Sequence, residues 1–138
     1  MRISLALQFY LWVGLGGALG TLARYGLSGL VAVQFGETFP WGTLAVNVLG
    51  SFVIGFAAVL TAPDGRLFVG PTARQFVMTG ICGGFTTFSS FSLNTLNLIR
   101  DGEWGYAGLN MVGSVVLCMI SVWLGAACAT LLNQFKGA

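Results

Sequence analysis

Four long apolar runs, separated by short polar connections, account for nearly the whole chain. The runs cover residues 5–33, 41–61, 70–99 and 104–132. Each reaches the roughly 20 residues that a helix needs to cross the hydrocarbon core of a bilayer. The connections contain Pro, Gly, Asp and interfacial Trp, and they read GETFPW, APDGR and RDGEW. The pattern predicts an all-α membrane protein with four transmembrane helices, forming one domain over residues 1–138.

Composition supports the membrane class and excludes several functions. Hydrophobic residues make up 56% of the chain, charged residues only 7%, and the mean hydropathy is +0.86, whereas a soluble domain carries about 25% charged residues. A net charge of +2 gives no basis for nucleic-acid binding. The absence of histidine excludes imidazole ligation of haem and most zinc sites. We interpret the three cysteines, Cys82, Cys118 and Cys128, as small packing residues.

The charges at the ends of the runs give only a weak orientation signal. With four spans, both termini and the 62–70 connection lie on one side, which holds Arg2, Arg66, Arg74 and Lys136. The opposite side holds Arg24 and Arg100. Four cations against two is a slight bias by the positive-inside rule. Both a single orientation and insertion in two opposite orientations, with antiparallel self-pairing, are compatible with it. The first 20 residues share features of a signal peptide, but the apolar pattern continues to Arg24, so we expect no cleavage.

Polar and small residues recur at helical spacing within three of the runs. The stripes are Thr43, Asn47 and Ser51 in the second run, Asn110, Ser114, Cys118 and Ser121 in the fourth, and Gly16, Gly20 and Arg24 in the first. Such stripes commonly mediate helix packing in lipid, and this is the interpretation that we prefer for the glycines. An asparagine brings four hydrogen-bonding sites that packing must satisfy. The asparagine stripes are therefore equally compatible with a polar path through the membrane.

The third run contains the segment TGICGGFTTFSSFS, residues 79–92, which is poorly suited to a continuous helix. Thirty residues of helix would be about 45 Å long, more than the roughly 30 Å hydrocarbon core. Gly80, Gly83 and Gly84 are poor helix formers, and Thr86 and Thr87 compete for backbone hydrogen bonds. The sequence therefore predicts a broken third helix. Non-helical backbone at this depth must be buried in protein or line an aqueous cavity, where freed carbonyls can bind a cation.

Two aromatic residues follow the predicted break. Phe88 and Phe91 are three residues apart, on one face of a helix. Aromatic pairs usually pack in a core. The positive edge of an aromatic ring, placed beside Ser, Thr and Asn donors, also suits the passage of a small anion without a fixed positive charge.

These segments resemble the Fluc (CrcB) family of fluoride channels along nearly the whole chain. GGALGTLARYGL (16–27) resembles the first-helix motif of the family, WGTLAVNVLGSFVIG (41–55) the second, and TGICGGFTTFSSFS (79–92) the broken third helix. The resemblance implies an antiparallel, dual-topology homodimer in the cell inner membrane. It implies two pores that export fluoride passively from the cytoplasm and confer fluoride resistance, with a structural sodium ion at the dimer centre.

The resemblance also assigns roles to individual residues. The backbone carbonyls of Gly83 and Thr86 from each subunit would hold the sodium ion. Phe88 and Phe91 would be the paired rings of the ion path. The family pattern further implies that Asn47, Thr43 and Ser114 line the pore and that Arg24 lies near its vestibule.

Two positions depart from the family pattern. Asn110 also falls on the implied pore path, where some members have tyrosine, and its role is less defined. Asn94 stands where members commonly have glutamate, and an amide binds an anion without transferring a proton.

Three other readings are less consistent with the sequence. A small multidrug transporter needs a membrane-embedded carboxylate, which the first run lacks. A non-transporting subunit would explain the glycines but not a hydroxyl-rich break. The sequence does not favour an enzyme because, without histidine and with every carboxylate in a connection, no catalytic set assembles.

Overall fold

The computed structural model describes residues 2–135, and within them it contains helices and no strand. Two cations of the orientation prediction, Lys136 and the side chain of Arg2, lie outside the described residues. The elements are α1 (Arg2–Phe35), α2 (Trp41–Leu60), α3 (Pro71–Gln75), the π-helix η1 (Phe76–Cys82), α4 (Gly83–Phe85), α5 (Phe88–Arg100) and α6 (Trp104–Gln134).

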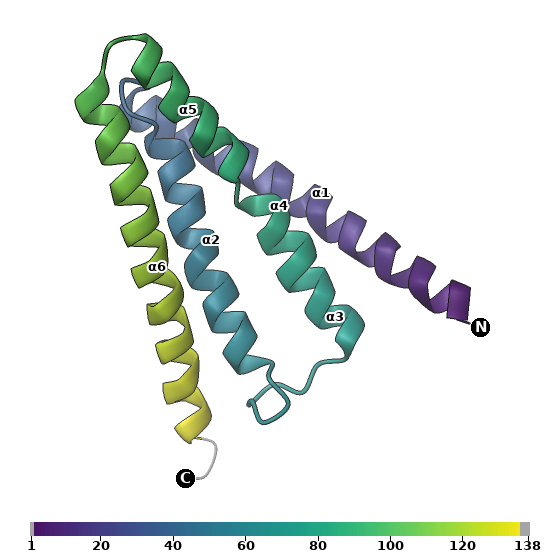
Figure 1. Ribbon diagram of the computed structural model, residues 1–138. Coiled ribbons are helices and arrows are strands. Elements are labelled where there is room, and N and C mark those ends of the chain that lie inside the picture. Colours follow the sequence, from purple (N-terminus) through teal and green to yellow (C-terminus); the bar gives the residue numbers. More distant parts are fainter. Residues whose placement is uncertain (1, 136–138) are drawn as a thin grey trace.

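Four helical spans are long and apolar enough to cross a membrane, as the sequence predicts. They are Ser4–Phe35, Trp41–Leu60, Pro71–Arg100 and Trp104–Gln134. The third span comprises α3, η1, α4 and α5, so the predicted broken helix is confirmed. Figure 1 shows a short non-helical link between α4 and α5.

Helices α2 and α6 pack along most of their length, as Figure 1 shows. Glycines allow this close approach: a Cβ on Gly55 would collide with the carbonyl oxygen of Val122, and one on Gly125 with that of Phe52. Ser121 adds a hydrogen bond of 2.7 Å from its hydroxyl to the carbonyl oxygen of Val48. Small residues are the usual means of close helix packing in lipid.

Helix α1 packs against η1 and α4, and its N-terminal part diverges from the other helices (Figure 1). A Cβ on Gly16 would lie 2.5 Å from the carbonyl oxygen of Phe76, and one on Gly20 would collide with that of Ile81. The glycine stripe of the first span thus serves helix packing, as we expected.

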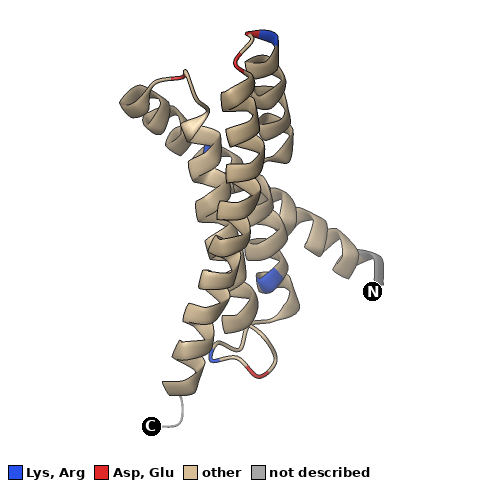
Figure 2. Ribbon diagram, turned by 60° about the vertical axis from the view of Figure 1, so that its left-hand side comes forward, with Lys and Arg blue, Asp and Glu red and all other residues tan. Residues whose placement is uncertain are grey.

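Charged residues lie mainly near the two ends of the molecule (Figure 2). All four carboxylates, Glu37, Asp64, Asp101 and Glu103, belong to connections between the spans. Between the ends, many large apolar side chains face outward, including Leu22, Leu30 and Val33. Such a surface suits lipid and the apolar faces of other membrane helices.

Candidate ion pathway

The helix break lies at two threonines. Thr86 and Thr87 have extended backbones, with φ/ψ of −89°/156° and −152°/114°. The backbone N–H and the hydroxyl of Thr86 both donate to the carbonyl oxygen of Cys82, over 3.0 and 2.9 Å. The hydroxyl oxygen of Thr87 accepts from the N–H of Ser90 over 3.1 Å and so caps α5. These side chains replace the helical bonds that the break removes.

Asn47 of α2 bonds to both backbone groups of Thr87. Its Oδ1 accepts from the N–H of Thr87 over 2.7 Å, and its Nδ2 donates to the carbonyl oxygen of Thr87 over 3.0 Å. The two residues are 40 positions apart in sequence. Backbone groups that would otherwise be unpaired at membrane depth are thereby satisfied.

Arg24 lies beside the break on its α1 side. Its Nε donates to the carbonyl oxygen of Gly84 over 2.9 Å, and Thr21 donates to the same oxygen over 3.5 Å. The structure therefore places this arginine, which the family pattern assigned to the vestibule, against the backbone of α4. A cation within a span is costly unless it finds such a partner.

A cavity of about 380 Å³ lies on the other side of the break, and we call it the phenylalanine cavity. It brings together most of the residues assigned to the ion path. Its polar and aromatic lining includes Asn47, Ser51, Thr86, Thr87, Phe88, Phe91 and Ser114. None of the described residues that line it is Asp, Glu, Lys or Arg.

The two rings of this cavity are arranged as a tilted pair. The ring centroids of Phe88 and Phe91 are 5.2 Å apart, with planes inclined by 49°. Phe88 is 76% exposed in the isolated subunit. A ring so exposed contributes little to the core of its own subunit, so burial does not explain its presence.

Asn110 lies apart from the cavity, buried between α5 and α6 with 2% of its surface exposed. Its Nδ2 donates to the hydroxyl of Thr95 over 2.9 Å, and its Oδ1 accepts from the hydroxyl of Ser114 over 3.3 Å. The hydroxyl of Ser114, which lines the cavity, therefore donates to Asn110, which lies outside the cavity. Sequence reasoning did not single out Thr95, because its partner is 15 residues away and on another helix.

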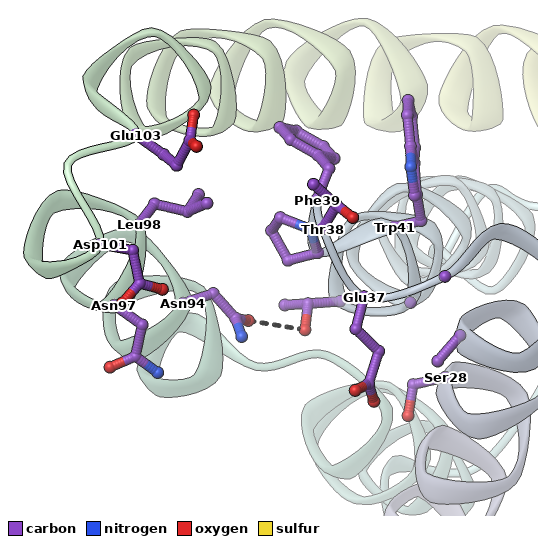
Figure 3. Close-up of a pocket in the computed structure, with 15 residues that line it drawn as sticks. Ser28, Glu37, Thr38, Phe39, Trp41, Asn94, Asn97, Leu98, Asp101 and Glu103 are labelled. Carbon is purple, nitrogen blue, oxygen red and sulfur yellow. Dashed lines mark hydrogen bonds between the residues drawn. The ribbon is translucent and has the colours of Figure 1, made fainter.

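A second cavity, of about 600 Å³, lies at the end of the molecule that holds three carboxylates, and we call it the acidic cavity. Figure 3 shows Glu37, Asp101 and Glu103 around it, with Asn94 and Asn97 of α5. The hydroxyl of Thr43 donates to Oδ1 of Asn94 over 2.9 Å, the dashed line of Figure 3.

The two cavities adjoin along α2. Thr43 lines the acidic cavity and Asn47 the phenylalanine cavity, and residues four apart are one helical turn apart. On α5, Asn94 of the acidic cavity and Phe91 of the phenylalanine cavity are three residues apart, which also places them about one helical turn apart on one face. The predicted polar stripe thus runs from the end of the molecule to the break.

The carbonyl groups of Gly83 and Thr86 are compatible with a cation site that is shared between chains. Among residues 2–135, the carbonyl oxygens of Gly83 and Thr86 accept no hydrogen bond across the helix break. Gly83 is exposed on the subunit surface. No group of three or more His, Cys, Asp or Glu residues suited to a metal occurs among the described residues. Unwound backbone carbonyls, such as that of Thr86, and carbonyls at the C-terminal end of a half-helix, such as that of Gly83, are the donor types that sodium uses in other membrane proteins.

Fold and site together define a small integral membrane protein in which a broken helix opens onto an uncharged cavity lined by rings and hydrogen-bonding groups. The chain belongs to the CrcB family, whose model, described as "CrcB-like protein, Camphor Resistance (CrcB)", matches residues 11–126.

Curated relatives align with this chain over almost their entire length. Proteins named "Fluoride-specific ion channel FluC" are 66% identical in Opitutus terrae, over 96% of this chain and 100% of the relative, and 58% identical in Methylocella silvestris, over 94% and 98%. The protein of that name from Rhodospirillum rubrum is 57% identical over 91% of this chain and 97% of the relative.

Proposed function

We infer that this chain is a fluoride channel, a non-enzymatic protein that passes fluoride across the membrane it spans. The observation that carries this function is the phenylalanine cavity, in which Phe88, Phe91 and Ser114 lie beside the helix break without a charged side chain. Relatives at 57–66% identity are named fluoride-specific ion channels, which supports fluoride as the transported ion.

The cavity suits an anion that is strongly hydrated. Moving fluoride into a low-dielectric interior is very costly unless other donors replace its water. The remaining Nδ2 proton of Asn47 and the positive edges of the two rings supply such donors, and the hydroxyl of Ser114 joins them when it turns away from its acceptor on Asn110. Because no fixed cation lines the cavity, each site holds the ion weakly, and weak successive sites are what conduction requires.

We further propose that two subunits assemble as an antiparallel homodimer. Phe88 is exposed in one subunit, and the phenylalanine cavity opens to the outside, so a second chain would complete its wall. The weak charge bias of the connections is consistent with insertion in both orientations.

A sodium ion at the dimer centre is part of this proposal. The carbonyl groups of Gly83 and Thr86 would hold it, two from each chain. The ion would supply positive potential near the path without a mobile side chain. We assign the protein to the cell inner membrane, where passive export of fluoride from the cytoplasm would confer fluoride resistance.

Fluoride efflux from liposomes that contain the purified protein tests the function. We expect rapid release, followed with a fluoride electrode, and negligible release of chloride from matched vesicles. If folded protein released neither fluoride nor chloride, the channel assignment would be overturned, and a non-transporting membrane subunit would be favoured.

Sodium and the dimer require separate measurements. Single-molecule photobleaching in dilute liposomes should give two steps per fluorescent spot. Replacing sodium with N-methylglucamine should reduce fluoride flux while chloride exclusion persists. Flux that is unchanged after sodium has been removed on both sides would refute the sodium site but leave the fluoride channel standing.

A further inference from the structure

Helix α5 carries both phenylalanines and packs mainly against α6, while it contacts α2 only sparsely. Only Thr95 and Leu98 of this helix are buried within the subunit. Its link to α2 consists largely of two polar contacts, Thr43 to Asn94 and Asn47 to Thr87. On its α2 side, the start of α5 that carries the rings is therefore held mainly by hydrogen bonds.

The contact between Asn47 and Thr87 has the geometry of a strand pair. An extended residue directs its N–H and C=O to the same side, and in an antiparallel ladder a neighbouring residue pairs with both. Thr87 is extended, and the side-chain amide of Asn47 takes the place of the neighbouring residue, at 2.7 and 3.0 Å. This pairing selects the extended conformation, because a helical Thr87 would direct its two groups in opposite directions.

We infer that Asn47 is a positioning residue, which acts on conduction by holding the backbone of Thr87 extended so that α5 begins at Phe88. This role rests on the proposed channel function and differs from that of a direct ligand of the ion. Both polar atoms of the Asn47 amide are engaged by Thr87, and one Nδ2 proton is left. Loss of the pairing would leave the N–H and the C=O of Thr87 without partners, a costly state at membrane depth.

An ester at position 87 separates positioning from ligation. Incorporating the α-hydroxy acid analogue of threonine removes the N–H of Thr87 and leaves Asn47 unchanged. The ester also makes the carbonyl of Thr86, a proposed sodium ligand, a weaker acceptor, so the sodium dependence of flux is measured in parallel and should match that of the unsubstituted protein. We expect a roughly fivefold loss of fluoride flux, the size that one hydrogen bond typically brings. Asn47→Leu should lose at least as much, and the ester combined with Asn47→Leu should lose no more than Asn47→Leu alone.

The same analogue at Thr130 is the matched control. Thr130 is an exposed residue of α6, and its hydroxyl bonds locally to the carbonyl oxygen of Ala126. An ester there should leave flux within the error of the measurement. If the ester at Thr87 also leaves flux unchanged while Asn47→Leu lowers it, Asn47 acts directly on the ion and the inference is overturned.

Hydrogen exchange of the Thr87 amide gives a readout that does not depend on transport. In the unsubstituted protein this amide should exchange slowly, and Asn47→Leu should accelerate its exchange at least tenfold more than that of Ser90. Equal exchange in the two proteins would overturn the pairing. If the unsubstituted protein conducts no fluoride, the channel assignment fails, whereas the exchange data still decide whether Asn47 holds Thr87.

Discussion

Arg24 and Gly84 are joined by a hydrogen bond of 2.9 Å that runs from the guanidinium Nε on α1 to a backbone carbonyl next to the helix break. The bond couples the cation of the first span to the third span. The freed carbonyl gains a charged donor, and the cation gains a partner within the membrane.

Removing the guanidinium group should destabilise the fold. For Arg24→Leu we expect a loss of roughly 1.5–3 kcal/mol, the range for hydrogen bonds that involve a charged group. Thermal unfolding in detergent measures it. Arg100→Leu, which removes an exposed cation at the end of α5, is the control. Equal melting temperatures for the two variants would contradict a stabilising contact between Arg24 and Gly84.

Adding a methyl group at Gly20 should separate α1 from the third span. A Cβ there collides with the carbonyl oxygen of Ile81, which belongs to backbone and moves only with its helix. Overpacking of this kind costs typically 1–3 kcal/mol. Gly14→Ala is the matched substitution on the same helix, since its Cβ meets nothing within 4 Å. The fraction of folded protein recovered by gel filtration after a heat step should fall for Gly20→Ala alone.

Truncating the rings should impair transport without unfolding the subunit. Because Phe88 is 76% exposed, Phe88→Ala removes little buried area, and we expect fluoride flux to fall at least tenfold with a nearly unchanged melting temperature. Phe91→Ala should also reduce flux. Phe68→Ala is the control for the loss of a ring, because Phe68 is 93% exposed in the connection before α3, and it should leave flux unchanged. Intact flux and selectivity in both pathway variants would show that the rings serve packing.

Restoring a carboxylate at position 94 tests the departure from the family pattern. Thr43 donates to the oxygen of Asn94, and a glutamate still offers an acceptor there. We expect Asn94→Glu to accelerate fluoride transport without altering assembly, since a carboxylate can also take up and release a proton. Asn97→Glu adds the same charge to the acidic cavity, which Asn97 also lines. Equal flux in both variants would indicate that position 94 does not limit the rate.

The four spans and the broken third helix were predictable because they follow from lengths and hydropathy, which are local properties. The break falls within the predicted segment, at Thr86 and Thr87 and directly before Phe88, but the glycines do not take part in it. Gly80, Gly83 and Gly84 were also expected to be weak points, yet all three lie in η1 and α4. The reason is tertiary: Gly80 and Gly84 pack against the backbone of Gly16 and Gly17 on α1, which holds that segment helical.

The bonds that shape the site were hidden for a similar reason. Asn47 and Arg24 stood out as polar residues in apolar runs, but their partners, Thr87 and Gly84, are 40 and 60 positions away. A periodic pattern shows which face of a helix a residue occupies, not which residue it meets. A local signal did exist for Thr87, because threonine is a favoured N-cap residue whose hydroxyl accepts from the N–H three residues later.

The connection between α5 and α6 has a consequence for how the protein is made. Only residues 101–103 separate the two helices, and Gly102 makes the turn with a φ of 78°. So short a link holds the end of α5 beside the start of α6, so these two helices form a helical hairpin, and α2 is synthesised before either of them. The contact between Asn47 and Thr87 therefore joins an earlier part of the chain to a later one, and it forms only when α5 has packed beside α2.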